Sequence, residues 1–234
     1  MGWFGAKGEA AVDPAARERL AETVHRRLAE DVGRLGLPSP DDRVIDERVI
    51  DAIRNVPREA FVPRGSRDQA FIDAALPLGH GQTVSQPSVL ALMTAALGVR
   101  AGDRVLEIGV GSGYQTAVLA QIGARVFGIE HVPELLQGAR ARLAGLGVTG
   151  VTLRCGDGAR GWPEEAPFDG ILAACAARSV QDALLTQLRA GGRMVLPVGP
   201  PSGPQQLVLI TKDRAGRLAE KPLIPVMFVP MVGS

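Results

Sequence analysis

Glycine residues at alternate positions follow an apolar strand pattern near the middle of the chain. The run Arg104-Val-Leu-Glu-Ile-Gly-Val-Gly-Ser-Gly-Tyr114 places Glu107, Gly109, Gly111 and Gly113 in the pattern E-x-G-x-G-x-G. Glycine lets the backbone turn tightly and come close to a ligand without a Cβ in the way. A helix pattern follows, and the first N–H groups of a helix have no partner inside it. We therefore expect a ligand to lie over this turn, close to the helix N-terminus.

An acidic residue ends the next strand pattern. Glu130 closes the run Arg125-Val-Phe-Gly-Ile-Glu130, where a carboxylate can accept hydrogen bonds from ribose hydroxyls. The dinucleotide fingerprint G-x-G-x-x-G is not met, because Tyr114 stands where its third glycine belongs. No Walker A lysine lies nearby. The pattern matches the S-adenosyl-L-methionine (AdoMet) site of Rossmann-like methyltransferases, and a purely structural turn and an NAD site are the alternatives.

A glycine-flanked aspartate follows one strand further on. Cys155-Gly-Asp-Gly158 places Asp157 at the carboxyl end of a strand pattern. There it can accept a hydrogen bond from an adenine amino group, or it can simply stabilise a turn. Because parallel sheets of this kind bind ligands at the carboxyl ends of their strands, we favour a cofactor-binding role for Asp157 and Gly158.

Strand and helix signals around these turns predict the fold. From Gly102 onward they alternate, which predicts an α/β fold with a mostly parallel sheet covered on both faces. The last two strand signals have no convincing helix between them and predict an antiparallel edge. The predicted strands are 104–109, 125–130, 151–155, 169–174, 192–197, 206–212 and 225–229, and the predicted helices are 113–122, 133–146 and 180–190.

Helices are predicted for most of the first third of the chain. Asp13 suits an N-cap and Pro14 the first helical position. The predicted segments are helices over 14–35, 46–56 and 87–98, with an irregular stretch over 57–86. We expect a single domain, in which residues 1–98 form a helical flank or lid on an AdoMet-binding core of residues 99–234.

The composition argues against several other classes of protein. Among 234 residues, 26 Lys and Arg are offset by 25 Asp and Glu, so no basic stripe points to nucleic acid. No apolar stretch reaches membrane-spanning length, and the N-terminus lacks the apolar block of a signal peptide, which predicts a cytoplasmic protein. Cys155 and Cys175 lie in or beside apolar strand patterns, and we expect buried, reduced thiols there rather than a disulfide or a metal site.

Four further segments carry a resemblance to a known family. They are Val49-Ile-Asp-Ala-Ile-Arg-Asn-Val-Pro-Arg-Glu-Ala-Phe-Val-Pro63, Gly81-Gln-Thr-Val-Ser-Gln-Pro87, the stretch from Gly156 to Asp169, and Gly191-Gly-Arg-Met-Val-Leu-Pro-Val-Gly199 with Gln205-Gln-Leu207. In this order, from about residue 45 to the C-terminus, the chain resembles the protein-L-isoaspartate O-methyltransferases, which repair damaged aspartyl and asparaginyl residues.

The resemblance implies methyl transfer from AdoMet to the free α-carboxylate of an L-isoaspartyl residue in a protein or peptide. The ester then closes to a succinimide without enzyme help, and hydrolysis partly restores aspartate. Ser85 is the implied active-site residue, and Thr83, Val84 and Gln86 are expected to position the substrate. Ser85 could also be a helix N-cap ahead of Pro87, and the two roles are compatible. The implied cofactor contacts are Glu107, Gly109, Gly111, Gly113, Glu130, Asp157 and Gly158.

One departure from the family pattern concerns the acceptor. Cys175-Ala-Ala-Arg-Ser-Val180 stands where the family has small residues and a proline, beside the expected substrate cleft. The same fold acting on a dedicated peptide is therefore an alternative, as are a non-catalytic AdoMet sensor and an oxidoreductase. A carboxylate is already ionised near neutral pH and needs no general base, so the reaction does not require a His–Asp or Cys–His pair. The sequence leaves the oligomeric state open.

Overall fold

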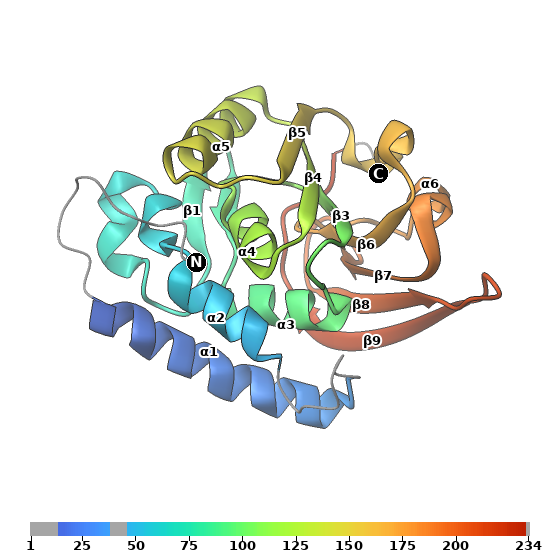
Figure 1. Cartoon of the computed structure of the whole chain (residues 1–234), viewed down its shortest axis with the longest axis horizontal. Helices are drawn as coiled ribbons and strands as arrows, with labels where there is room; N and C mark the ends of the chain where they lie inside the picture. Colours follow the sequence, from blue (N-terminus) through green and yellow to red (C-terminus); the bar gives the residue numbers. More distant parts are fainter. Residues whose placement is uncertain (1–13, 38–45, 233–234) are drawn as a thin grey trace.

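A seven-stranded sheet forms the centre of the chain in a computed structural model, which describes residues 14–37 and 46–232 (Figure 1). Its strand order is β5-β4-β3-β6-β7-β8-β9. The strands are β3 (Arg104–Ile108), β4 (Arg125–Glu130), β5 (Val151–Cys155), β6 (Phe168–Ala173), β7 (Leu188–Val198), β8 (Gln205–Lys212) and β9 (Leu218–Val226). Strands β3 to β7 pair in parallel, whereas β8 and β9 are antiparallel. The predicted α/β fold with an antiparallel edge is confirmed.

Alternate residues of the central strands build two separate cores, because successive side chains of a strand point to opposite faces. Val105 of β3 joins a cluster with the N-terminal helices, and its neighbour Leu106 joins the cluster on the other face. Leu172 and Ile171 of β6 divide in the same way. The apolar runs of these strands therefore reflect burial on both faces.

The helices cover the two faces of the sheet unequally. They are α1 (Pro14–Leu35), α2 (Glu47–Asn55), α3 (Pro87–Leu97), α4 (Tyr114–Ile122), α5 (Pro133–Gly145) and α6 (Asp182–Gln187). Buried residues of α1 to α5 share one cluster, and α1 lies outermost, along α2 and α3 (Figure 1). The other face packs against α6, the short 3-10 helix η3 (Gly158–Arg160) and Trp162, which precedes a second 3-10 helix, η4 (Pro163–Glu165).

The segment expected to be irregular contains ordered elements, so that prediction is wrong in part. It forms the 3-10 helices η1 (Arg58–Ala60) and η2 (Arg64–Gln69) and an antiparallel hairpin of β1 (Leu76–Gly79) and β2 (Gln82–Val84). The hairpin is a sheet of its own. Strands of four and three residues are too short for an alternating pattern to reveal them.

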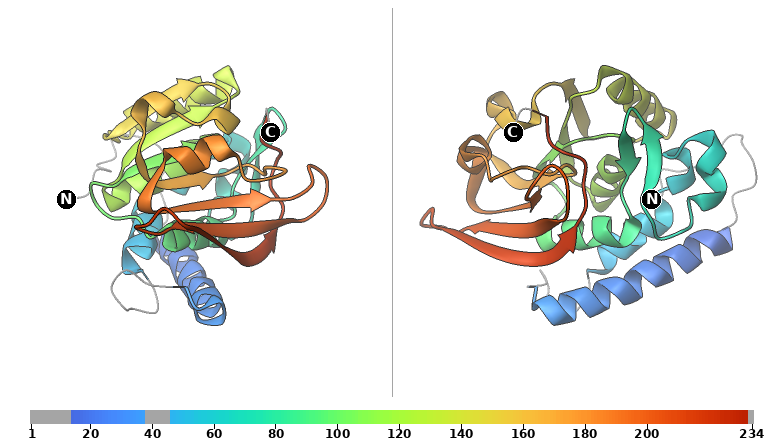
Figure 2. Two further views of the ribbon diagram at one scale, coloured as in Figure 1. Left: turned by 90° about the vertical axis from the view of Figure 1, so that its right-hand side faces the viewer. Right: turned by 180° about the vertical axis from the view of Figure 1, so that it is seen from behind.

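Two further boundaries differ from the prediction. The helix expected over 180–190 ends at Gln187, and Leu188 already begins β7. The strand expected over 225–229 is β9, which begins at Leu218 and ends at Val226. The first half of β9 is largely exposed and holds two apolar residues, Leu218 and Ala219, followed by two charged ones, so it has no alternating apolar pattern that would mark a strand. The β8–β9 hairpin projects from one edge of the molecule (Figure 2).

The predicted N-cap Asp13 lies outside the described residues. None of the helices within 14–37 and 46–232 is both long enough and apolar enough to span a bilayer.

Candidate active site

A cavity of about 800 Å³, its open mouth included, lies at the carboxyl ends of β3 and β4. Segments far apart in the sequence form its wall, namely residues 82–85, 108–112, 114–115, 129–132, 174–175 and 229–232, together with Leu90 and Gly158. The site therefore joins the N-terminal third of the chain to the sheet.

The glycine loop, residues 109–113, turns between β3 and α4 with left-handed backbone at all three glycines. Their φ angles are +84° at Gly109, +54° at Gly111 and +89° at Gly113, which other residues rarely adopt. Gly109 and Gly111 line the cavity. A Cβ on Gly113 would instead lie 3.4 Å from Leu143 of α5, so Gly113 lets the loop pack closely on that helix.

Both carboxylate oxygens of Glu130 accept hydrogen bonds from the backbone of the cavity wall. Its Oε2 accepts a hydrogen bond of 2.7 Å from the backbone N–H of Gly111, and its Oε1 accepts one of 2.9 Å from Val132. The side chain is buried and also lines the cavity. Each carboxylate oxygen can accept a second hydrogen bond, so Glu130 holds two backbone turns and still offers an acceptor to a ligand.

Glu107 lies in the core beneath the glycine loop and is not part of the cavity wall. It is fully buried, and burial raises the pKa of its carboxyl to about 8. Its closest polar partner is Thr116 on the first turns of α4. A direct contact between Glu107 and the cofactor stays a prediction.

Asp157 also lies off the wall, while its neighbour Gly158 is on it. The Oδ1 atom of Asp157 accepts a hydrogen bond of 2.9 Å from the backbone N–H of Ala159 and caps η3. The turn role is therefore confirmed, and the adenine contact stays a prediction. A Cβ on Gly158 would lie 2.3 Å from Ile108, which explains why a glycine is needed there.

Ser85 lines the cavity together with Thr83 and Val84, on a different stretch of wall from the glycine loop. Helix α3 begins at Pro87, and its N-cap residue is Gln86. The proposed capping role of Ser85 is therefore wrong, because Ser85 precedes the cap position. Gln86 does not line the cavity, and its Nε2 donates to Oδ2 of Asp73 at 3.2 Å.

Two cysteines received the same prediction and have different surroundings. Cys175 is buried on the cavity wall, as predicted, and burial together with the charge of Glu130 raises the pKa of its thiol to about 12. Cys155 is exposed, contrary to the prediction, because β5 is the edge strand of the sheet and ends at the surface. Both thiols are free.

Residues 229–232, here called the C-terminal wall, were not found by sequence reasoning. The backbone N–H of Ala176 donates to the carbonyl of Val229 at 2.8 Å, and the N–H of Met231 donates to the carbonyl of Ala176 at 2.7 Å. No motif marks this segment, since it joins the site only through tertiary pairing. Tyr114, Gln115 and His131 also line the cavity, and their adjacency to the glycine loop and to Glu130 was the only available signal.

These residues fit AdoMet. The left-handed glycines leave the loop open toward the cavity, and the carboxylate of Glu130 offers an acceptor on its wall. Both features lie at the carboxyl ends of adjacent parallel strands. A mostly parallel sheet with an antiparallel edge and this loop defines a class I AdoMet-dependent methyltransferase.

A family model described as protein-L-isoaspartate(D-aspartate) O-methyltransferase (PCMT) matches residues 40–234. The chain belongs to this family. It is 52% identical over 187 residues to the protein-L-isoaspartate O-methyltransferase of Methylorubrum extorquens (strain PA1), covering 80% of this chain and 81% of the relative. It is 53% identical over 193 residues to that of Myxococcus xanthus (strain DK1622), covering 81% of this chain and 90% of the relative.

Solved structures agree with this family. A protein-L-isoaspartate O-methyltransferase structure superposes with a TM-score of 0.78 at 28% identity, covering 93% of this chain and 66% of that chain. A Plasmodium falciparum structure in complex with S-adenosyl-L-homocysteine (AdoHcy) has a TM-score of 0.71 at 24% identity, covering 90% of this chain and 99% of that chain, and shares the fold. The resemblance seen in the sequence motifs is confirmed, as is AdoMet-dependent methylation of L-isoaspartyl residues.

Proposed function

We propose that the cavity holds AdoMet over the glycine loop and receives the free α-carboxylate of an L-isoaspartyl residue beside Ser85. The observation that carries this proposal is that Ser85 and Gly111, from two distant segments, line one cavity. A cofactor on the loop and an acceptor on the Ser85 segment would then share the same space. Only an acceptor that fits the remaining volume can approach the cofactor.

The cofactor side depends on the loop and on Glu130. When bound, AdoMet supplies an electrophilic methyl group on a positively charged sulfur. Gly109 and Gly111 allow the backbone to approach it, and Glu130 accepts hydrogen bonds from the ribose hydroxyls while it holds the loop in place. Glu107 and Gly113 support the loop from the protein interior. Gly158 lies on the cavity wall next to Asp157, and we propose that this pair borders the adenine.

The acceptor side needs hydrogen-bond donors rather than a base. The α-carboxylate is ionised near neutral pH, and strong desolvation would protonate it. The hydroxyls of Ser85 and Thr83 can keep it ionised and aimed, because both residues line the cavity. Positioning of this kind can contribute on the order of 7–11 kcal/mol to the rate. The raised pKa of Cys175 keeps its thiol protonated, so no thiolate competes for the methyl group.

A paired-peptide assay tests this function. The enzyme is incubated with AdoMet and either an isoaspartyl peptide or the same peptide with normal aspartate, and methylation is followed by mass spectrometry. We expect a mass gain of one methylene on the isoaspartyl peptide only. Methylation of neither peptide would overturn the proposal.

A dedicated acceptor is the second candidate, because Cys175 and Ala176 of the unusual 175–180 segment contact the cavity or its C-terminal wall. Isoaspartyl peptides with varied neighbouring residues separate the two candidates. Methylation in a single sequence context supports a dedicated acceptor, whereas methylation in many contexts supports general repair. A cytoplasmic location and the absence of nucleic-acid partners stay predictions from the composition.

A further inference from the structure

Arg58 is a buried cation in segment 56–63. Neither the cofactor side nor the acceptor side of the proposed reaction uses this residue. Its side chain is only 2% exposed. The Nη1 atom donates to the carbonyls of Ala70 at 2.7 Å and Ile72 at 2.9 Å. The Nη2 atom donates to the carbonyls of Ala74 at 2.7 Å and Ser85 at 3.3 Å. The guanidinium therefore connects the segment before β1 to the backbone of the predicted active-site residue.

The same guanidinium also faces the first residue of α4. Its Cζ lies 5.9 Å from the ring centroid of Tyr114, which follows the glycine loop directly and lines the cavity. A cation over an aromatic face is stabilised by the ring's quadrupole. Arg58 thus contacts both the Ser85 segment and the element that begins at the end of the glycine loop.

Burial of this charge makes the arrangement geometrically demanding. Burial lowers the pKa of Arg58, yet an arginine keeps its charge in proteins. A buried charge is costly unless fixed dipoles or counter-charges compensate for it. Within the described residues, the hydrogen bonds of Arg58 all go to backbone carbonyls. These carbonyls must hold their positions for the cation to stay in the core.

Asp73 holds the same segment from its other side. Its Oδ1 accepts a hydrogen bond of 2.9 Å from the backbone N–H of Ser88, and its Oδ2 accepts one of 3.2 Å from Nε2 of Gln86. Arg27 of α1 pairs with Oδ2 at 2.8 Å. The backbone at Ser85 is therefore held by Arg58, and the residues after it by Asp73.

We propose that Arg58 is a positioning residue for methyl transfer, because it fixes the backbone of Ser85 relative to Tyr114 and hence to the glycine loop. This inference rests on the proposed role of Ser85. Arg58 itself is not on the cavity wall, so it acts through Ser85 and makes no contact with either substrate. Displacements of about 1 Å in a reacting geometry can cost on the order of a hundredfold in rate.

Replacement of Arg58 by lysine tests the proposal, since Arg58→Lys keeps the charge and removes the planar fork of donors. We expect kcat for an isoaspartyl peptide to fall by roughly ten- to a hundredfold. The Kd for AdoHcy, measured by calorimetry, should stay near the wild-type value. Equal losses of turnover and AdoHcy binding would overturn the proposal, because they indicate a general structural role.

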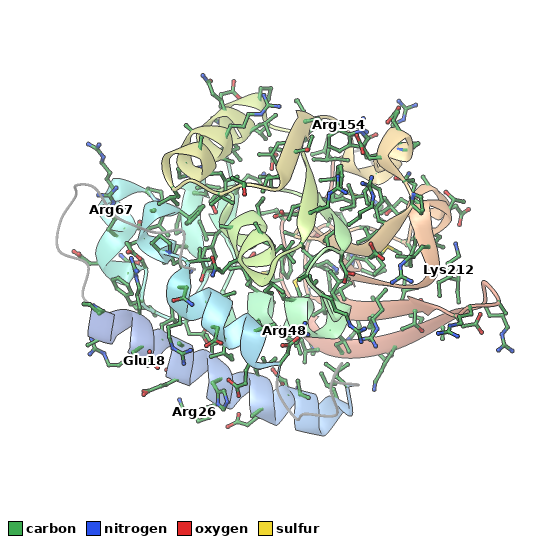
Figure 3. The ribbon with its side chains drawn as sticks, in the orientation of Figure 1. Glu18, Arg26, Arg48, Arg67, Arg154 and Lys212 are labelled. Atoms are coloured by element: carbon green, nitrogen blue, oxygen red, sulfur yellow. The ribbon has the colours of Figure 1, made fainter. Side chains whose placement is uncertain are left out.

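Lys212 offers a matched control. Its Nζ donates to the carbonyls of Leu185 at 3.0 Å and Leu188 at 2.8 Å. It lies on the opposite side of the molecule from Arg67 of η2 (Figure 3). Lys212→Met should lower the melting temperature and leave kcat unchanged. A fall in kcat as large as that of Arg58→Lys would show that any lost cation–carbonyl contact has this effect, which would overturn the proposal.

A double-mutant cycle with Ser85→Ala separates the positioning role of Arg58 from the proposed role of Ser85. If Arg58 acts through Ser85, Arg58→Lys should cause little further loss of kcat in the Ser85→Ala background. The same loss in both backgrounds would overturn the positioning role and leave the role of Ser85 intact. Wild-type turnover of Ser85→Ala would remove the role of Ser85 and this inference together.

Asp73→Asn keeps the inference testable if Arg58→Lys does not fold. The variant weakens the hydrogen bonds to Gln86 and Arg27 while preserving the volume of the side chain. We expect a smaller fall in kcat with unchanged AdoHcy affinity. An unchanged kcat would contradict the idea that the placement of the Ser85 segment limits methyl transfer.

Discussion

Thr116 donates its hydroxyl to Oε2 of Glu107 at 2.6 Å, while Oε1 of the same carboxyl has no partner among the described residues. Burial is the main reason that the pKa of Glu107 rises to about 8; the Thr116 hydrogen bond lowers it, and the charge of Glu130 raises it. A pKa of about 8 favours the protonated form of this carboxyl at neutral pH. The protonated form avoids an unpaired buried charge in the core beneath the glycine loop.

Glu107→Gln should flatten the pH dependence of stability. The pKa of Glu107 is about 8 in the folded protein and near 4.5 when exposed, so the folded state binds the proton more tightly. Its contribution to stability is complete below pH 4.5 and is lost as the pH rises to about 8. The difference between the folded and unfolded pKa values corresponds to at most about 5 kcal/mol of unfolding free energy, at about 1.4 kcal/mol for each pKa unit. Urea unfolding of wild type and variant across this range measures it.

The exposed residue Glu134, on the first turn of α5, is the control. Glu134→Gln should leave the slope of unfolding free energy against pH as it is in the wild type. Equal slopes for wild type and Glu107→Gln would show that Glu107 is ionised in the folded protein, against the direction given by its burial.

Gly111→Val should abolish AdoHcy binding. A Cβ at this position would lie 3.6 Å from Cδ2 of Leu78, so the branched side chain must displace Leu78 or enter the cavity. Gly36 has nearly the same φ angle, +56° against +54°, and open space around its Cβ position. Gly36→Val should thus cost a similar 1–2 kcal/mol or so of backbone strain without loss of binding. Calorimetry with AdoHcy decides, and retained affinity in Gly111→Val would contradict the site.

Glu130→Ala should weaken AdoHcy binding by roughly 1–3 kcal/mol, because charged hydrogen bonds to the ligand and to the loop are lost together. The backbone N–H groups of Gly111 and Val132 lose their acceptor in this variant. Glu134→Ala removes an exposed carboxylate a few residues away and should leave the Kd unchanged. An identical Kd in both variants would remove Glu130 from the ribose role.

Ser85→Ala should lower kcat more than it changes the Kd for AdoHcy. The residue lines the cavity and does not cap α3, so its hydroxyl is available to orient the acceptor carboxylate. Ser66→Ala, in η2 and outside the cavity wall, is the matched control and should keep full activity. If Ser85→Ala turns over isoaspartyl peptide at the wild-type rate, the hydroxyl has no part in orienting the substrate.

The parts of the site that follow from local sequence could be predicted, and those that follow from tertiary pairing could not. Alternate glycines and Glu130 at a strand end were visible because turn chemistry and strand periodicity are local. Arg58 stood in a motif, but nothing in the sequence indicates that its donors reach Ser85. The C-terminal wall joins the cavity through long-range pairing, in which the backbone of Ala176 hydrogen-bonds to Val229 and Met231.

Gln205 braces that C-terminal wall and gives the last prediction. Its side chain is only 3% exposed, its Oε1 accepts from the N–H of Phe228 at 2.8 Å, and its Nε2 donates to the carbonyl of Phe228 at 3.3 Å. The amide therefore pairs with the backbone just beyond β9 as a neighbouring strand would. Gln205→Leu leaves both groups of Phe228 without partners, which should cost about 1–3 kcal/mol of stability.

The same loss should loosen residues 229–232, so kcat/KM for an isoaspartyl peptide should fall along with the melting temperature. Gln206→Leu is the matched control, because the Nε2 of Gln206 contacts only its neighbour Leu207 among the described residues. That variant should keep kcat/KM near the wild-type value. Full kcat/KM in a destabilised Gln205→Leu would show that the wall does not depend on the brace, since the Ala176 pairing would then hold it alone.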